Sequence, residues 1–274
     1  VRSTGVRGEL SVVGALTSLQ SLNLSATKVT GSLDALEPLH ELEELHLDRT
    51  AVTGSLLPLG RGCPKLHSLH ISRMPGLRVD LDREVAQLPN LRKLYMIASG
   101  GIKGSLAFAA HLPQLEELDC SELLDLTGDL ESLAGARNLA FLSVGGCREL
   151  FRNTARTDEG LAPLASLTKL SSLHLGSTDV CSTLKPLAGL TELTLLGIGN
   201  ARALHGGLEP LAGLPKLARV FMDECTGLTG DVGVMGKLPS LKELSIGACI
   251  GLTGVATFQA EHRERVNFSC FGLL

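Results

Sequence analysis

Leu19-Gln20-Ser21-Leu22-Asn23-Leu24 is the first of ten copies of one pattern, L-x-x-L-x-L, in which other apolar residues sometimes replace a leucine. The copies begin at Leu19, Leu42, Leu66, Leu91, Leu115, Leu139, Leu170, Leu193, Leu217 and Leu241. Successive copies are 23, 24, 25, 24, 24, 31, 23, 24 and 24 residues apart. Such a period, held along nearly the whole chain, indicates one structural unit stacked many times.

Each unit has a strand part and a tail. The last two apolar residues of the pattern lie two apart, which predicts a short strand with one buried face. A tail such as residues 207–216 places Leu208, Leu211 and Leu214 three apart, which suits one turn of α- or 3₁₀-helix that Pro210 keeps short. One unit cannot bury its own apolar edge, so neighbouring units must stack.

A small residue stands three positions after the last apolar residue of the pattern in six units, where its side chain can bond backbone groups of the turning chain. These residues are Thr27, Thr50, Cys147, Thr178, Cys225 and Cys249. A segment such as Val29-Thr30-Gly31-Ser32-Leu33 often follows, and its glycine permits backbone dihedral angles that other residues avoid.

These features resemble the leucine-rich-repeat family, and the resemblance covers essentially the whole chain. V-T-G-S-L is similar to part of the plant-type repeat, without the proline usual after it. Cys-x-x-Leu at Cys147, Cys225 and Cys249 is similar to repeats of intracellular immune receptors, so the subclass stays open. The resemblance implies an α/β fold: a right-handed solenoid arc with a parallel β-sheet inside, short helical or irregular segments outside, and a protein-interaction role.

We expect a single domain over residues 1–274. Residues 1–18 match the second half of a unit, residues 19–258 hold ten repeats, and residues 259–274 form a C-terminal cap. In the cap, Val266-Asn267-Phe268 fits an abbreviated eleventh strand, with Asn267 in the fifth position of the pattern. Phe258, Phe268 and Phe271 are expected to cover the last open core, as a terminal cap must.

The 31-residue step contains an insertion near residues 150–159. Insertions in solenoids map to loops on one face, often the binding face, so Phe151, Arg152 and Arg156 are candidate contacts. A tolerated surface bulge is an equally good interpretation, because the cost of closing a loop rises only slowly with its length.

The third, fifth and seventh positions of each unit should point away from the core and form columns along the inner surface. Five residues there are apolar or aromatic, namely Tyr95, Ile97, Phe141, Leu195 and Phe221. Aromatic anchors in a polar surround are typical of binding hot spots, although scattered exposed apolar residues are also common. The charged and histidine candidates on this surface are Glu44, His46, Asp48, His70, Lys93, Glu117, Asp119, His174, Arg219 and Asp223.

The seventh column also has glycine at Gly145, Gly176, Gly199 and Gly247. These glycines either let a partner's backbone approach closely or ease the bend after the strand, and we favour the bend.

Composition and charge restrict the function. The aromatic fraction is 3%, with no Trp, and the net charge is −4 with both signs interspersed. Clustered Lys and Arg, which a phosphate backbone would require, are absent from the predicted inner face, so nucleic acid is not expected as a partner. No run of apolar residues is long enough to span a bilayer, so membrane insertion is not expected either.

The sequence holds no pattern that indicates an enzyme, and we expect no catalytic residues and no cofactor. Phosphate-binding, nucleophile-elbow and zinc-protease motifs are absent, since position 44 is Glu where H-E-x-x-H would need His. His46 and His70 should be neighbours, with Glu44 and Asp48 nearby; a weak metal site is conceivable there, but a plain exposed pair is favoured.

The seven cysteines show no clustered pattern of the kind found in secreted caps, which favours reduced thiols and an intracellular, cytoplasmic location. Two sequons, at Asn23 and Asn267, argue the other way, but both fall on the predicted inner face. The leading hypothesis is a non-catalytic scaffold that binds a protein on its inner face, as a docking subunit of a larger complex. The alternative is the ligand-sensing region of an immune or signalling receptor.

Overall fold

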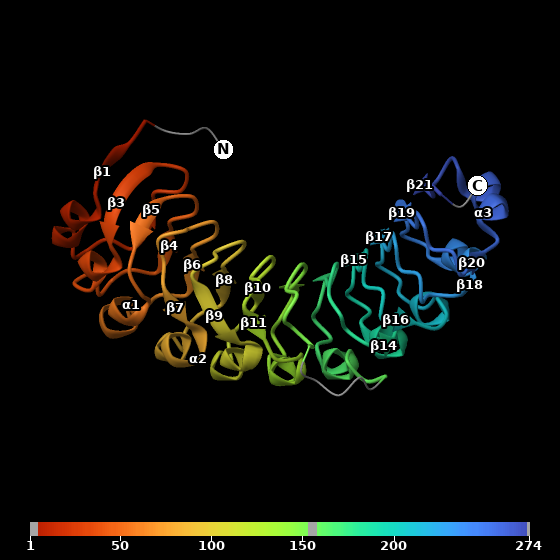
Figure 1. Cartoon of the computed structure of the whole chain (residues 1–274), viewed down its shortest axis with the longest axis horizontal. Helices are drawn as coiled ribbons and strands as arrows, with labels where there is room; N and C mark the ends of the chain where they lie inside the picture. The colour runs from red at the N-terminus through yellow and green to blue at the C-terminus, as the bar shows by residue number, and fades with distance from the viewer. Residues whose placement is uncertain (1–4, 153–157, 273–274) are drawn as a thin grey trace.

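The computed structural model describes residues 5–152 and 158–272 of the chain. These residues wind into an open arc whose hollow is lined by one parallel sheet of 11 strands (Figure 1). Its strands, in spatial and chain order, are β2 (Ser21–Asn23), β4 (Glu44–His46), β6 (Ser68–His70), β8 (Lys93–Tyr95), β10 (Glu117–Asp119), β12 (Phe141–Ser143), β13 (Ser172–His174), β15 (Leu195–Gly197), β17 (Arg219–Phe221), β19 (Glu243–Ser245) and β21 (Asn267–Ser269). The arc with a parallel inner sheet, expected from the resemblance, is confirmed. A single domain over the whole chain stays a prediction.

The strands pair without slippage through ten repeats. Leu22 pairs with Leu45, and Leu45 pairs with Leu69, so each pattern leucine stacks on its counterpart in the next unit. Leu45 and Leu69 are fully buried, as are nearly all the pattern leucines between them and β19. The solenoid core is therefore a continuous column of leucines behind the inner sheet.

The eleventh strand differs from the expected register by two residues. Asn267 pairs with Glu243 and Ser269 with Ser245, so Asn267 takes the third position and Ser269 the fifth. Val266 is buried but lies one residue before the strand, and Phe268 and Cys270 take the inward positions. The apolar side chain of Val266 does not place it in the strand, because the regular 24-residue step from Glu243 to Asn267 decides the register.

The outer side carries only short helices, as expected (Figure 1). The α-helices are α1 (Leu57–Gly62), α2 (Leu81–Glu84) and α3 (Val255–His262). The 3₁₀ helices are η1 (Leu10–Ala15), η2 (Leu33–Leu36), η3 (Val85–Gln87), η4 (Leu106–His111), η5 (Glu131–Leu133), η6 (Ala162–Ser166), η7 (Lys185–Gly189), η8 (Glu209–Leu211) and η9 (Val232–Lys237). Proline occupies the first turn of α1, η6, η7 and η8, where its missing N–H leaves no bond unmade.

Short strands also form beside the inner sheet, and the sequence reasoning missed them. They are β1 (Arg7–Glu9), β3 (Lys28–Ser32), β5 (Ala51–Thr53), β7 (Val79–Asp80), β9 (Ile102–Ser105), β11 (Leu126–Thr127), β14 (Ser182–Thr183), β16 (Leu204–His205), β18 (Gly230–Asp231) and β20 (Leu252–Thr253). Several arise from the V-T-G-S segments, whose β-branched Val and Thr favour extended backbone. The glycine of these segments does adopt the predicted unusual dihedral angle, as at Gly31 (φ 109°) and Gly54 (φ 108°).

The bend after each inner strand lies at the eighth position, with φ of 57° at Arg49 and Arg73. The seventh-position glycines have no positive φ, so the interpretation that they ease the bend is wrong. Their role is close approach between neighbouring units. A Cβ on Gly145 would lie 3.2 Å from the carbonyl oxygen of Gly176, and one on Gly176 would lie 3.0 Å from that of Gly199.

The small residues after the bend make the predicted backbone bonds, in two different ways. Thr27, Thr50 and Thr178 donate to a carbonyl three residues back, with Oγ1–O distances of 2.6, 2.8 and 2.6 Å. Cys147, Cys225 and Cys249 instead donate to a carbonyl 27 residues back, in the preceding unit, with Sγ–O distances of 3.0, 3.0 and 2.9 Å. The threonines therefore fix a bend within one unit, and the cysteines join two units.

The described flanks of the insertion lie away from the inner sheet. Phe151 is only 6% exposed and belongs to the core, so its side chain is not available as the expected surface contact. Arg152 is exposed and pairs with Glu149, and Arg156 lies outside the described residues.

The C-terminal cap is built by α3 rather than by all three expected phenylalanines. Phe258 is buried against Phe268, with ring centroids 5.2 Å apart, but Phe271 is 67% exposed. Across the described residues, no helix has the length and apolarity needed to cross a membrane.

Candidate functional site

The inner face carries a continuous row of rings, which we call the aromatic ladder. It consists of His46 (β4), His70 (β6), Tyr95 (β8), Phe141 (β12) and His174 (β13). Successive ring centroids are 4.0, 4.4, 6.2 and 5.8 Å apart. The parallel register places the fifth-position residues His46, His70 and Tyr95 next to each other. Phe141 instead holds the third position of its repeat, in register with Glu117 and Ser172.

The ladder passes over β10, which has no ring. Asp119 holds the fifth position there and is buried, and the rings of Tyr95 and Phe141 approach each other across this strand. Glu117 on the same strand accepts a hydrogen bond from the Tyr95 hydroxyl and pairs with Lys93 at 2.7 Å. The centre of the ladder is therefore fixed by a Lys–Glu–Tyr network.

The surroundings shift the protonation of the ladder. Burial lowers the pKa values of His70 and His174, which favours neutral imidazoles at neutral pH. Burial and the hydrogen bond to Glu117 raise the pKa of Tyr95. Burial alone would raise the pKa of Glu117, but the bonds from Lys93 and Tyr95 outweigh it and lower that pKa. The ladder thus presents neutral imidazoles at His70 and His174, and the carboxylate of Glu117 beside Tyr95.

The ladder ends at β15, where Gly197 leaves room for the His174 ring. A Cβ on Gly197 would lie 2.9 Å from His174 Nδ1. Phe221 lies on β17, beyond this gap, and is half-buried. Leu195 is only 9% exposed, so it contributes little of the apolar surface expected of it. Of the five apolar candidates, Tyr95 and Phe141 belong to the ladder and Ile97 lies beside it.

Three acidic candidates bond the backbone. Asp48 accepts a hydrogen bond from the Ser72 amide at 2.8 Å, and Asp223 accepts one from the Gly247 amide at 2.6 Å, each across to the next unit. Asp119 accepts one from the amide of Ser121, two residues later, at 3.0 Å. These carboxylates therefore stabilise strand ends, whatever else they contact.

A hollow of about 330 Å³ opens where the first inner strands end. It is lined by Ser25, Ala26, Asp48, Arg49, His70, Ser72, Arg73, Tyr95 and Ile97. The sequence reasoning missed Arg49 and Arg73, because the eighth position was not treated as facing the inner surface. The repeated position of these two residues after the pattern was the signal available.

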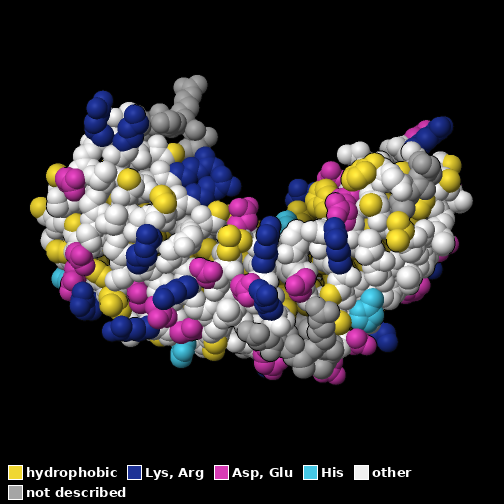
Figure 2. Space-filling view, viewed as in Figure 1, with side chains coloured by type: hydrophobic (Ala, Val, Ile, Leu, Met, Phe, Trp, Pro, Cys, Tyr) yellow, Lys and Arg dark blue, Asp and Glu magenta, His cyan; other side chains and the backbone are white. Residues whose placement is uncertain are grey.

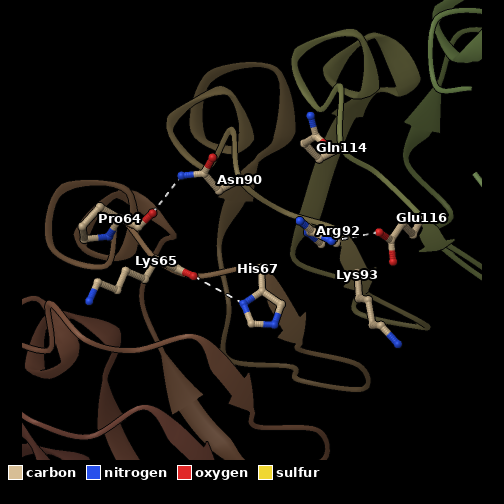
Figure 3. Close-up of a pocket in the computed structure, with 8 residues that line it drawn as sticks. All are labelled: Pro64, Lys65, His67, Asn90, Arg92, Lys93, Gln114 and Glu116. Atoms are coloured by element: carbon tan, nitrogen blue, oxygen red, sulfur yellow. Dashed lines mark hydrogen bonds and ion pairs between the residues drawn. The ribbon is translucent and has the colours of Figure 1, made fainter. Parts of the chain in front are cut away.

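A second hollow of about 570 Å³ lies beside the beginnings of the strands and is shown in Figure 3. Its charged side chains are paired across units: Arg92 with Glu116 at 3.2 Å, and Lys65 with Glu41 at 2.6 Å. Figure 2 shows basic and acidic side chains interspersed over most of the visible face, with one group of Lys and Arg side chains gathered on the left wall of the arc's hollow. The charges of this side are therefore largely balanced by their neighbours.

His46, Asp48 and His70 have potential metal-ligand atoms within 4.8 Å of one another, while Glu44 stands outside this group. The two imidazoles are stacked, with an interplanar angle of 24°. Because imidazole donates to a metal in the plane of its ring, nearly parallel stacked rings do not aim at one point. The stacking of His46 and His70 therefore fits the aromatic ladder better than a metal centre.

The remaining candidates are spread along the arc. Glu44 on β4 accepts a bond from the Ser21 hydroxyl at 3.2 Å. Arg219 is exposed on β17, three units from Phe141 in the sheet order. The structure thus brings the inner-face candidates from Glu44 to His174 into one surface and leaves Arg219, Phe221 and Asp223 as a separate group, while Phe151 and Arg152 lie outside both.

No family model and no curated protein sequence matches the chain. Solved structures do match. An internalin of Listeria monocytogenes is 23% identical with a TM-score of 0.72, and the match covers 94% of this chain and 68% of that one. A leucine-rich-repeat protein of Leptospira interrogans is 17% identical with a TM-score of 0.64, covering 99% of this chain and 70% of that one.

A plant peptide hormone receptor, RGFR1, solved in complex with RGF2, is also similar. It is 21% identical with a TM-score of 0.68, and the match covers 88% of this chain and 40% of the receptor. The chain spans less than half the length of this receptor and of two other plant receptors, which it covers at 32% and 39%. At these identities the likeness concerns the fold alone.

Proposed function

This chain has the leucine-rich-repeat fold, which is typical of protein-binding scaffolds, and from that premise we propose that it is a non-catalytic scaffold for a protein partner. The observation that supports the proposal most directly is the aromatic ladder on the inner face. Aromatic side chains lose little conformational entropy on binding and supply much contact area, which is why they dominate binding hot spots. The scaffold would act as a docking subunit of a larger complex.

The charges around the ladder favour a protein over a nucleic acid. Lys93 is paired with Glu117, and Asp48 stands beside His70 in the adjoining hollow. A phosphate backbone would need several unpaired Lys and Arg residues along one track. A partner with an apolar or aromatic segment and a mixed polar rim matches this surface better.

Affinity purification from native extract tests the proposal, with bound proteins identified by mass spectrometry. We compare the parent chain with a Tyr95→Ala/Phe141→Ala double variant, which removes the centre of the ladder. Ile250→Ala is the matched control, because Ile250 is an apolar side chain that is 75% exposed outside the inner columns. Circular dichroism and thermal melts establish that each variant is folded.

The proposal predicts a partner that the parent and Ile250→Ala retain and the double variant loses. Each lost anchor should weaken binding by about 1–3 kcal/mol, an amount large enough to abolish recovery of a micromolar complex. Recovery of the same partner by all three proteins would move the binding surface to an end, the outer side or the insertion.

A second function, the ligand-sensing segment of a receptor, is favoured by the likeness to plant receptors, one of them solved in complex with RGF2. The two functions differ in the bound molecule. The receptor segment would be favoured if the parent chain binds a peptide of a few residues, recovers no folded protein, and loses the peptide on Tyr95→Ala/Phe141→Ala substitution. A folded protein would favour the scaffold.

We also propose an intracellular, cytoplasmic location, because all seven cysteines carry free thiols and six of them are buried. Asn23, in one of the two sequons, uses its side-chain oxygen to accept the amide of Ser25 at 3.0 Å. Attachment of a glycan there would compete with the inner surface that the scaffold needs.

A further inference from the structure

A second cluster of ligand-forming side chains lies apart from the inner face, beside the end of the insertion. Asp158, Cys181 and His205 each offer one ligand atom, and the three atoms lie within 4.8 Å of one another. They come from three successive parts of the solenoid: the insertion, the segment before β14, and the end of β16. Nothing in the proposed scaffold function uses them.

The backbone holds these residues together. The Gly160 amide donates to the Cys181 carbonyl at 3.1 Å, and the Ser182 hydroxyl donates to the Asp158 carbonyl at 3.1 Å. A bridge between Glu159 and Ser182 reinforces both contacts. The insertion therefore ends in a position fixed beside Cys181.

The other side of the cluster is fixed by strand pairing. Thr183 of β14 pairs with His205 of β16, so the two strands carry Cys181 and His205 into adjacent units. The lengthened repeat thus supplies the third residue, Asp158, to a pair that the regular repeats already form. The end of the insertion therefore lies where it adds a carboxylate to Cys181 and His205.

The two ring nitrogens of His205 have different partners. Nδ1 lies 3.2 Å from the Ala203 carbonyl oxygen, which can only accept, so Nδ1 carries a proton. In the neutral ring Nε2 then bears the lone pair, and it points at Asp158 Oδ1, 3.3 Å away. In that state His205 Nε2 and Asp158 Oδ1 are two acceptors that face each other, which is unfavourable. A proton on Nε2 or a metal ion between the two atoms would remove the conflict.

Several features of the cluster are those of a metal site. A metal-binding histidine usually donates its second ring nitrogen to a backbone carbonyl, as His205 does to Ala203. An Nε2–Oδ1 separation of 3.3 Å is near the edge of a tetrahedron whose bonds are about 2.0–2.1 Å long. Cys181 is the one cysteine of the chain that is not buried, so an ion from solution can reach its sulfur.

We propose that Asp158, Cys181 and His205 bind a zinc ion through one sulfur, one nitrogen and one oxygen, with water as the fourth ligand. Thiolate and imidazole together favour zinc over magnesium or calcium, which prefer oxygen ligands. The ion joins the insertion to the two units that follow it. Binding replaces the thiol proton of Cys181, so affinity falls as the pH is lowered.

The test uses the full chain, stripped of metal by a chelator, kept reduced and titrated with zinc chloride in a calorimeter. A parallel titration with cobalt chloride gives a signature that zinc lacks, because a cobalt–thiolate bond produces a charge-transfer absorption band. Binding of one ion per chain, with a charge-transfer band on cobalt, is the expected result. Zinc should also raise the melting temperature, because it binds the folded state.

Three variants identify the ligands. Cys181→Ser removes the charge-transfer band, and His205→Gln and Asp158→Asn each weaken binding by at least about tenfold. His67→Gln is the matched control, because His67 Nδ1 also faces a carbonyl two residues back, that of Lys65 at 3.4 Å, and His67 belongs to neither group of potential metal ligands found among the described residues. This control retains the affinity of the parent.

Three outcomes would overturn the proposal: no uptake of zinc or cobalt by the parent, cobalt binding without a charge-transfer band, or binding that survives Cys181→Ser and disappears in His70→Ala. The last result would place the ion on the inner face instead. If no ion binds, His205 and Asp158 form a plain ion pair that depends on a protonated imidazole. The first two results do not bear on partner capture by the aromatic ladder, which the Tyr95→Ala/Phe141→Ala variant tests by itself, so the two proposals can fail separately.

Discussion

At the scale of single residues, threonine and cysteine are alternative solutions for the bend after an inner strand. Thr178 bonds within its own unit, whereas Cys225 bonds the carbonyl of Ile198 in the preceding one. Burial raises the pKa of Cys225 to about 12, so the thiol keeps the proton that it donates. The choice of residue therefore decides whether a bend is fixed locally or by its neighbour.

Thr178→Val tests the local bond, because valine keeps the shape of threonine and removes its hydroxyl. The carbonyl of Leu175 loses the side-chain bond in a buried site, so the free energy of unfolding should fall by about 1–2 kcal/mol. Urea denaturation of the two proteins measures this difference. Thr168→Val, at an exposed position, should change it by less than about 0.5 kcal/mol. Equal effects of the two substitutions would contradict the role of the bond.

The histidines of the ladder predict how stability depends on pH. Burial lowers the pKa values of His70 and His174 in the folded chain, so below the pKa of an unfolded histidine, about 6.5, the unfolded state binds more protons. These two groups therefore destabilise the fold as the pH falls from about 6.5 toward their folded pKa values, and have no effect above it. Melting temperatures should fall across that interval.

The matched protein for this experiment is the His70→Gln/His174→Gln variant. Its melting temperature should change less than that of the parent between pH 7.5 and pH 5, since two of the groups that bind protons on unfolding are gone. An identical pH profile would mean that the ladder histidines are as easily protonated in the folded chain as in the unfolded one.

At the scale of elements, one buried carboxylate joins two helices of successive units. Glu84, at the end of α2, is 6% exposed and accepts the amide of Leu56, just before α1, at 2.6 Å. Its other oxygen accepts the amide of Asp80 at 3.1 Å, just before α2. Both amides belong to helix beginnings, which need an acceptor from outside the helix.

Glu84→Ala removes that acceptor from both helix beginnings. We expect a loss of about 2–4 kcal/mol in the free energy of unfolding, because the buried amide of Leu56 and the part-buried amide of Asp80 both lose their partner. Glu84→Gln, which keeps one acceptor oxygen, should lose less than Glu84→Ala. Urea denaturation orders the three proteins, and an alanine variant as stable as the parent would show that water replaces the carboxylate at no cost.

The elements also show what the sequence could predict. The inner strands followed from the period-2 spacing of the pattern leucines, and the outer turns from leucines three apart, because packing repeats the same solution in every unit. The strands beside the sheet were missed, since a Val-Thr pair is too short to signal a strand without its neighbour. The end strand was shifted because Arg265 stands where a leucine would mark the register.

The sequence predicted which candidate side chains lie together on the inner face, but not which of them bond the backbone or enter the core. The column rule placed His46, His70 and Tyr95 side by side, and the structure stacks them. The same rule could not tell that Asp48 and Asp223 bond backbone amides, or that Phe151 turns into the core, because those contacts depend on the exact path of the chain at each bend.

At the scale of the whole molecule, each unit contacts only its neighbours, so damage to one unit should stay near it. Leu173 on β13 is fully buried at the middle of the arc. Leu173→Ala should lower the free energy of unfolding by about 2–5 kcal/mol through the cavity that it leaves. Hydrogen exchange should lose protection mainly from Phe141 to Gly197, the three strands around the cavity.

Hydrogen exchange of peptides from both ends and from the middle of the chain, measured by mass spectrometry, shows whether protection is lost only near Leu173 or along the whole arc. Protection that falls equally from β2 to β21 would mean that the arc unfolds as one cooperative body, and the nearest-neighbour description would then be wrong for this chain.

The close approach of Gly145, Gly176 and Gly199 has a consequence for how such a chain changes length. These units contact each other through backbone atoms. The contact therefore does not depend on the side chains of the unit that follows. Residues 176–198 make one full period of 23, and their excision would join Leu175 to Gly199 and bring Gly199 against Gly145. A single recombination event in the gene could therefore add or remove one unit here without compensating substitutions elsewhere. The length of the arc would then change by whole repeats.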